Sequence, residues 1–240
     1  LNINKEKVQL AASISKSALC SDLVREYPEL QGVMGKYFAL SQGFEDDVAN
    51  SISDHYLPKG LTSVIPKKPL SYSIAIVDKI DSLVGFFLIN EKPTSSKDPF
   101  ALRRSAIGLL RTIIDNKLNL KLRNLISYNI KLLEEQGVTK TNENSENEIL
   151  NFLKERMKNI LKDKNIKNDI IEASISSYFS DNYFDLYKKN TLMNKYINKE
   201  AGINAISSYK RAFNIVESAK ENLSGRPDAV LFRKDEEKHL

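Results

Sequence analysis

Hydrophobic positions recur along most of the chain with the three-to-four-residue spacing of amphipathic helices. No segment alternates polar and apolar residues for long enough to predict a strand. The pattern therefore predicts an all-α protein. Helices are expected over residues 5–26, 29–40, 46–55, 70–88, 99–115, 120–136, 149–161, 168–179, 182–197 and 199–223.

The polar run at residues 137–146 separates these helices into two groups. Runs of Thr, Asn, Ser and Glu without apolar residues are typical of linkers. We therefore expect a first domain over 1–136, a linker over 137–146 and a second domain over 147–240.

Residues 70–88 are apolar on nearly all sides, which predicts a central helix. Asp78 and Asp81 lie three apart in this run, and we expect both of them, together with Asp22, to lie in the core. Buried carboxylates need a partner, a metal or a raised pKa. Gly32 and Gly35 lie in an earlier expected helix, where each glycine costs about 1 kcal/mol. Another element should approach closely there.

The chain of 240 residues is 41 % hydrophobic and 28 % charged, with a net charge of +5. This composition predicts a folded, soluble protein whose excess of basic residues suits an acidic partner such as nucleic acid. Scattered lysine alone is equally consistent with solubility. Clusters of basic residues are therefore the better evidence.

Few residues are available for chemistry. The single cysteine, Cys20, excludes an internal disulfide and a zinc–thiolate site, and it fits a cytoplasmic location. No secretory signal or membrane span is evident, and no phosphate loop, nucleophile elbow or H-E-x-x-H motif is present. His55 lies on an apolar helix face, so a packed histidine with one hydrogen bond is expected. We expect no independent catalytic centre.

A cluster of basic residues occurs where a polar loop meets the helix expected at 99–115. Asp98 is a suitable N-cap and Pro99 a suitable first residue. Arg104, Gly108 and Arg111 then share a face, with a bare backbone expected between two outward arginines. Guanidinium groups form paired hydrogen bonds with phosphate oxygens, and a glycine lets a nucleic-acid strand approach the helix backbone. Ion pairs with neighbouring helices are an equally good interpretation.

Several motifs resemble, in order and spacing, the β subunit of bacterial glycyl-tRNA synthetase. They are EYPELQGVMGKYFAL (26–40), HYLP (55–58), IAIVDKIDSLVGFF (74–87), KPTSSKDPFALRRSAIGLLR (92–111), YKRAFNI (209–215) and RPDAVLF (226–232). The resemblance covers essentially the whole chain, which would be the middle of a longer subunit. It implies a degenerate HD-type helical domain at 1–136 and a helical body segment at 147–240.

The resemblance also implies a function. In this family the enzyme is a heterotetramer of two α and two β subunits that ligates glycine to tRNA(Gly) with ATP and Mg²⁺. The α subunit carries the active site and the β subunit contributes tRNA binding. This segment would then bind tRNA, need no cofactor itself and have no contact with membranes.

HD-type hydrolases hold a metal with histidines and aspartates. Asp22 and Asp78 resemble the two aspartates, but Ser21 stands at the position of a metal-binding histidine. The two aspartates therefore resemble remnants of a metal site, and an active HD-type phosphohydrolase is the weakest of three hypotheses.

The leading hypothesis is a tRNA-binding segment, and the second is a scaffold that docks the α subunit or other β-subunit domains. For tRNA binding the expected contacts are Lys97, Arg103, Arg104, Arg111, Lys210 and Arg211.

Overall fold

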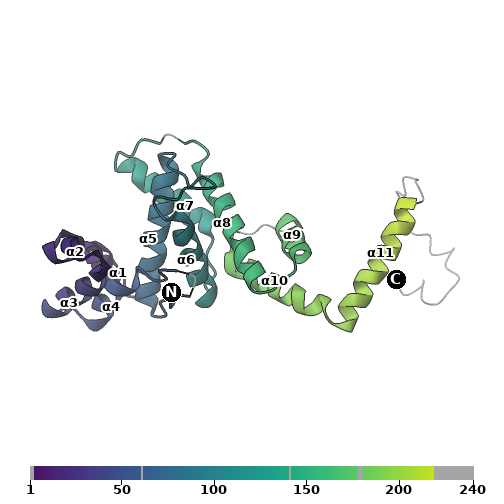
Figure 1. The fold of residues 1–240 in the computed structure, drawn as a ribbon, viewed down its shortest axis with the longest axis horizontal. Coiled ribbons are helices and arrows are strands. Elements are labelled where there is room, and N and C mark those ends of the chain that lie inside the picture. The colour runs from purple at the N-terminus through teal and green to yellow at the C-terminus, as the bar shows by residue number, and fades with distance from the viewer. Residues whose placement is uncertain (1–2, 61, 141, 178–180, 219–240) are drawn as a thin grey trace. The chain divides into compact units, whose positions relative to one another are not determined.

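The computed structural model describes residues 3–60, 62–140, 142–177 and 181–218 (Figure 1). These residues form eleven α-helices, two short 3₁₀ helices and no strand, which confirms the all-α prediction. No helix in the described ranges is long and apolar enough to cross a membrane. The expected end of the last helix at 223 and the motif at 226–232 lie outside the described residues.

The chain divides into two compact units, Leu1–Leu192 and Met193–Leu240. The division falls within α10 (Tyr183–Ile197). The polar segment expected as a linker joins α7 (Leu122–Glu135) to α8 (Ser145–Asp163), and these two helices pack together inside the first unit.

The N-terminal part of the first unit consists of short helices. The prediction of a single helix over 5–26 is wrong, because the first helix ends at Ile14. Serine side chains bond to the backbone on both sides of the break: Ser15 donates to the Ala12 carbonyl, and Ser21 accepts from the Val24 amide. Such bonds compete with the helical ladder. The elements are α1 (Lys5–Ile14), η1 (Ser17–Cys20), α2 (Asp22–Glu26), η2 (Pro28–Leu30), α3 (Val33–Ser41) and α4 (Asp46–Asp54).

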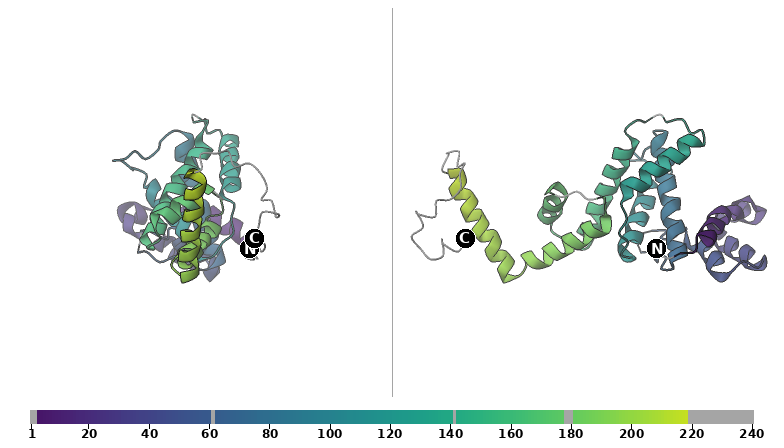
Figure 2. Two further views of the ribbon diagram at one scale, coloured as in Figure 1. Left: turned by 90° about the vertical axis from the view of Figure 1, so that its right-hand side faces the viewer. Right: turned by 180° about the vertical axis from the view of Figure 1, so that it is seen from behind.

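The helix predicted to be central is α5 (Pro69–Leu88). It packs against α1 and α4, and also against α6 (Leu102–Asp115), α7 and α8. Figure 1 and the right-hand view of Figure 2 show α5 between these neighbours. Leu83, Val84 and Leu88 are almost completely buried. The α5 helix thus connects the N-terminal helices to the three longer helices α6–α8.

The close approach expected at the two glycines is confirmed. A Cβ atom on Gly35 would lie 2.7 Å from Ile52 Cγ2, so glycine lets α3 and α4 pack closely. Gly32 precedes α3 with φ +82°, and a Cβ there would lie 2.6 Å from the Tyr56 ring. The close packing at Gly35 offsets its helix penalty, whereas Gly32 lies outside the helix and supplies the positive φ that precedes it.

The end of the first unit contains α9 (Asn168–Ser177) and the start of α10. In the second unit the described residues form the end of α10 and α11 (Glu200–Ser218). A Cβ on Gly202 would lie 2.2 Å from the Tyr196 carbonyl oxygen, so glycine permits the tight turn between these helices.

Candidate nucleic-acid interface

The loop that enters α6 is fixed by Asp98. Its two carboxylate oxygens accept hydrogen bonds from the Leu102 amide (2.8 Å) and the Arg103 amide (3.0 Å). The side chain therefore binds the first two amides of the helix, but the predicted N-cap position is wrong, because Ala101 occupies it and Asp98 lies four residues ahead of the first helical residue. Pro99 is not the first helical residue. Ala101 adopts a left-handed conformation (φ +53°), which delays the helix to Leu102.

Arg103 is engaged within this loop. Its guanidinium donates to the Thr94 carbonyl and lies 3.8 Å from an Asp98 carboxylate oxygen. These contacts connect the start of α6 to the preceding loop. The role of Arg103 in this structure is to hold that loop in place.

Arg111 is also engaged. Its guanidinium donates to the carbonyl oxygens of Gly60 (2.7 Å) and Ser63 (3.0 Å). These bonds fasten the loop between α4 and α5 across α6. The expectation that Arg111 reaches outward is therefore wrong, because a neighbouring loop uses its donors.

Gly108 is buried, so the expectation of a bare backbone between the arginines is also wrong. A Cβ on Gly108 would lie 2.9 Å from Lys79 Cε and 3.4 Å from Pro58 Cδ. The glycine makes room for the Lys79 side chain and for the proline loop.

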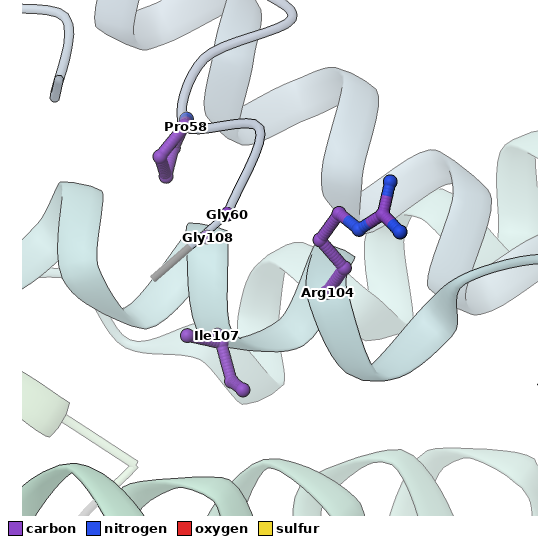
Figure 3. Close-up of a pocket in the computed structure, with 5 residues that line it drawn as sticks. All are labelled: Pro58, Gly60, Arg104, Ile107 and Gly108. Atoms are coloured by element: carbon purple, nitrogen blue, oxygen red, sulfur yellow. The ribbon is translucent and has the colours of Figure 1, made fainter. Parts of the chain in front are cut away.

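Arg104 is different from its two neighbours. It is exposed, and its side chain has no hydrogen bond or ion pair with any residue that the structure describes. It borders a hollow of about 220 Å³ that is also lined by Pro58, Gly60, Ile107 and Gly108. Figure 3 shows the Arg104 and Ile107 side chains leaving α6 on different sides. Lys97, in the loop before α6, is likewise exposed.

Arg104 also borders a larger cleft of about 530 Å³ between the N-terminal helices and α5–α6. The cleft has four basic and two acidic side chains. Its polar and aromatic lining includes Lys16, Glu29, Gln31, Tyr56, Lys59, Asp78, Lys79, Phe100 and Arg104.

Lys79 closes the inner side of this cleft. It is 5 % exposed, and its ammonium group donates to the carbonyl oxygens of Leu57 (2.8 Å), His55 (3.0 Å) and Ala75 (3.5 Å). Burial lowers the pKa of Lys79 to about 8, and the nearby Asp78 carboxylate opposes that shift. Lys79 joins α5 to the turn that follows α4.

The aspartates expected in the core have other environments. Asp22 is 93 % exposed at the side chain and pairs with Arg25 on the next helical turn. Asp81 is exposed and accepts from Asn129. Only Asp78 is largely covered, at 24 % exposure, and it pairs with Lys16 at 2.7 Å. Burial of Asp22 and Asp81 was therefore a wrong expectation.

This arrangement does not suit a metal ion. The one shielded carboxylate, Asp78, already contacts an ammonium group, while Ser21 serves as the N-cap of α2. The described residues contain no group of three or more His, Cys, Asp or Glu side chains placed to bind a metal. A hydrolytic HD centre would need more ligands than these.

His55 is completely buried beside these charges, as its apolar helix face predicted. Its ring nitrogens have no hydrogen-bond partner among the described residues, so the expected single bond is not seen. Burial, with Lys16 nearby, lowers the pKa of His55 to about 4. The Asp78 carboxylate and, to a smaller extent, the Ile52 backbone oppose this lowering of the pKa. His55 is thus neutral near pH 7.

Lys210 and Arg211 lie next to each other on α11 and are both exposed. They belong to the second unit, whereas Lys97, Arg103, Arg104 and Arg111 belong to the first. The structure thus brings four of the six expected residues onto one loop and helix, two with their donors used and two exposed. Phe100 and Lys59 were missed. An aromatic residue four positions before Arg104, within the basic cluster, was the available sequence signal for Phe100.

The fold and this cleft define an all-helical protein with a basic cleft between two groups of helices. The family profile described as "Glycyl-tRNA synthetase beta subunit" matches residues 1–176. The chain belongs to the glycyl-tRNA synthetase β-subunit family.

Individual relatives agree. The glycine–tRNA ligase β subunit of Rickettsia canadensis is 40 % identical over 237 residues, covering 99 % of this chain and 34 % of the relative. That of Ruegeria sp. is 38 % identical over 212 residues, covering 88 % and 29 %. That of Rhodospirillum centenum is 36 % identical over 240 residues, covering 98 % and 33 %. The chain spans about a third of the length of these relatives.

Proposed function

We propose that this chain is a tRNA-binding part of a glycyl-tRNA synthetase β subunit. It would support ATP-dependent ligation of glycine to tRNA(Gly), with the chemistry in the α subunit. The observation that carries the proposal is Arg104, an exposed guanidinium without a partner in the described ranges, at the edge of a basic cleft. Membership in the glycyl-tRNA synthetase β-subunit family supports tRNA as the ligand.

The physical argument is electrostatic. An exposed guanidinium forms forked, charge-assisted bonds with phosphate oxygens, and each phosphate that is neutralised releases counterions. Arg104 and Lys97 have exposed side chains for this role. Arg103 and Arg111 instead hold the two loops beside α6, because their guanidinium groups donate hydrogen bonds to carbonyl oxygens of those loops.

Arg104→Ala is the direct test. Binding of labelled tRNA(Gly) to the full chain is followed by fluorescence anisotropy over a range of salt concentrations. Loss of one phosphate contact should lower the slope of log K against log salt by roughly one unit, and should weaken different tRNAs alike. The matched control is Lys162→Ala, which removes an exposed cation at the end of α8 and should leave the slope unchanged. An unchanged slope for Arg104→Ala would exclude this contact.

Lys210 and Arg211 form a second candidate patch on α11. Because they lie in the other unit, their contribution is tested separately. The double variant Lys210→Ala/Arg211→Ala should lower the salt slope by roughly one to two units. A normal slope would leave tRNA binding to the first unit alone.

A scaffold is the second candidate function, and α11 provides the observation that favours it. Its large apolar side chains are exposed, which is typical of surfaces that contact another protein. A Phe213→Asp variant should then lose binding to the α subunit, measured by co-sedimentation. If the full chain binds no tRNA at low salt but binds the α subunit, the scaffold replaces the RNA-binding proposal. The side chains are Ile203, Tyr209, Phe213, Ile215 and Val216.

The remaining parts of the proposal concern the assembly. The partners would be tRNA(Gly), the α subunit and a second β subunit in a heterotetramer. ATP and Mg²⁺ would bind to the α subunit, and the location would be cytoplasmic. Sedimentation of the assembled complex would measure its stoichiometry.

A further inference from the structure

Phe100 is an aromatic side chain that the fold leaves at the edge of the large cleft. One face of its ring stacks on Phe86, with centroids 3.9 Å apart and planes at 19°. Phe100 nevertheless remains 42 % exposed, so its open surface is the other face and the ring edge.

The ring is held in place on both sides along the chain. Asp98 binds the first two amides of α6, and Arg103 binds the Thr94 carbonyl. Phe100 lies between these anchors and rests on Phe86 of the central helix. It is therefore a preorganised flat surface, and a ligand that stacks on it would need little additional ordering of the loop.

The cations of the cleft are unequally available. Lys16 pairs with Asp78, and Lys79 is held by backbone carbonyls. Arg104 and Lys59 are exposed, and neither side chain has a hydrogen-bond or ion-pair partner in the part of the chain that the structure describes. The cleft thus combines an open aromatic face with two cations that can bind phosphate.

The remaining polar lining suits the edge of a base. Glu29 can accept hydrogen bonds, and the Gln31 amide can both donate and accept. Unstacked RNA bases are recognised by aromatic stacking together with hydrogen bonds to their edges. The cleft volume of about 530 Å³ lies within the roughly 300–1,000 Å³ that is typical of small-ligand sites.

We infer that this cleft binds one unpaired RNA nucleotide, whose base stacks on Phe100 while Arg104 and Lys59 bind the adjacent phosphates. The inference rests on the proposed RNA-binding function and makes it more specific. Backbone recognition alone needs the cations but no aromatic surface. An unpaired nucleotide uses both.

The test compares two RNA hairpins with the same stem, one blunt and one with a single-stranded overhang of a few nucleotides. Binding of each to the full chain is measured by fluorescence anisotropy. The wild-type protein should prefer the overhang. Phe100→Ala should reduce affinity for the overhang hairpin by roughly 5- to 100-fold, in line with one lost base stack, and leave the blunt hairpin nearly unaffected. Arg104→Ala should weaken both.

Two control variants distinguish stacking from a change in folding. Phe100→Tyr keeps an aromatic ring and should keep the preference. Tyr37→Ala removes an exposed aromatic residue of α3 outside the cleft lining and should behave like wild type. Helical circular dichroism during thermal unfolding checks that each variant is folded.

The outcomes separate the two proposals. Equal affinity of the wild-type protein for both hairpins, or an overhang affinity unchanged by Phe100→Ala, would overturn the nucleotide site while RNA binding through Arg104 still stood. Absence of binding to both hairpins and to tRNA at low salt would overturn both proposals. A Phe100→Tyr variant that loses the preference as fully as Phe100→Ala would also argue against stacking.

Discussion

Gly108→Ala tests whether Lys79 is fixed as the structure shows. In an ordinary helix interior this change stabilises a protein by about 1 kcal/mol. Here the new Cβ would lie 2.9 Å from Lys79 Cε, so the lysine must move. A lysine side chain usually moves easily, but this one is held by three backbone carbonyls.

The magnitude follows from these opposing effects. Hydrogen bonds to a charged group contribute about 1.5–3 kcal/mol each, and partial loss of the Lys79 bonds would exceed the helix gain. We expect Gly108→Ala to lower the free energy of unfolding by about 1–2 kcal/mol. In a Lys79→Met background the side chain is no longer anchored, so the same change should be neutral or stabilise by up to about 1 kcal/mol.

Urea unfolding of the four proteins in this double-mutant cycle measures the coupling. The matched control is Gly85→Ala in α5, because a Cβ at Gly85 has no atom within 4 Å. That variant should be stabilised by about 1 kcal/mol. The reasoning is refuted if Gly108→Ala stabilises the wild-type protein as Gly85→Ala does, since the lysine would then be free to move.

Three further predictions concern stability. Because the pKa of His55 is lowered in the folded protein, the unfolded chain binds the proton first as the pH falls. The stability that the neutral His55 contributes is therefore complete above about pH 6.5 and falls by about 3 kcal/mol as the pH drops to about 4. The free energy of unfolding in urea should decline less steeply across this range in His55→Leu than in the wild-type protein, and an equal decline would contradict the assignment. Gly35→Ala should lower the free energy of unfolding by about 1–3 kcal/mol, because the new Cβ would lie 2.7 Å from Ile52 Cγ2 in a packed interface. A thermal unfolding curve that matches that of the wild-type protein would show that α3 and α4 can separate at no cost. Asp98→Ala should lose about 1–2 kcal/mol and Asp98→Asn less, because the amide keeps one acceptor for the cap; equal losses in urea would point to the ion pair instead.

Local patterns predicted most of the helices, because an apolar packing face recurs at a regular spacing, but they missed the breaks that divide residues 5–26 into α1, η1 and α2. The all-apolar run that became α5 is central, and His55 is buried as its helix face indicated. The same patterns failed for Asp81. A hydrophobic run predicts that most of its residues are buried. Whether one particular side chain is exposed depends on where the neighbouring helices leave a gap.

The arginines show the limit for the site. Arg104 and Arg111 are equivalent by spacing, yet only Arg104 is exposed without a partner among the described residues. The difference arises because the loop between α4 and α5 crosses α6 at Arg111. The path of a loop is set by tertiary contacts distant in sequence, and helical periodicity carries no information about it. Gly108 was misread for the same reason, since Lys79 reaches it from another helix.

The held residues also explain how the exposed ones can act. Each side chain that binding immobilises costs about 0.5–1.5 kcal/mol of binding free energy, and ordering a loop adds to that cost. Asp98 and Arg103 already fix the loop that carries Phe100, and Arg111 fixes the loop that lies beside Arg104. If the chain binds RNA as proposed, Arg103 and Arg111 would still favour binding, because they order the surface before RNA arrives. The cluster of arginines at this junction is then one unit, in which Arg103 and Arg111 hold the loops and Arg104 is exposed for the proposed contact with RNA.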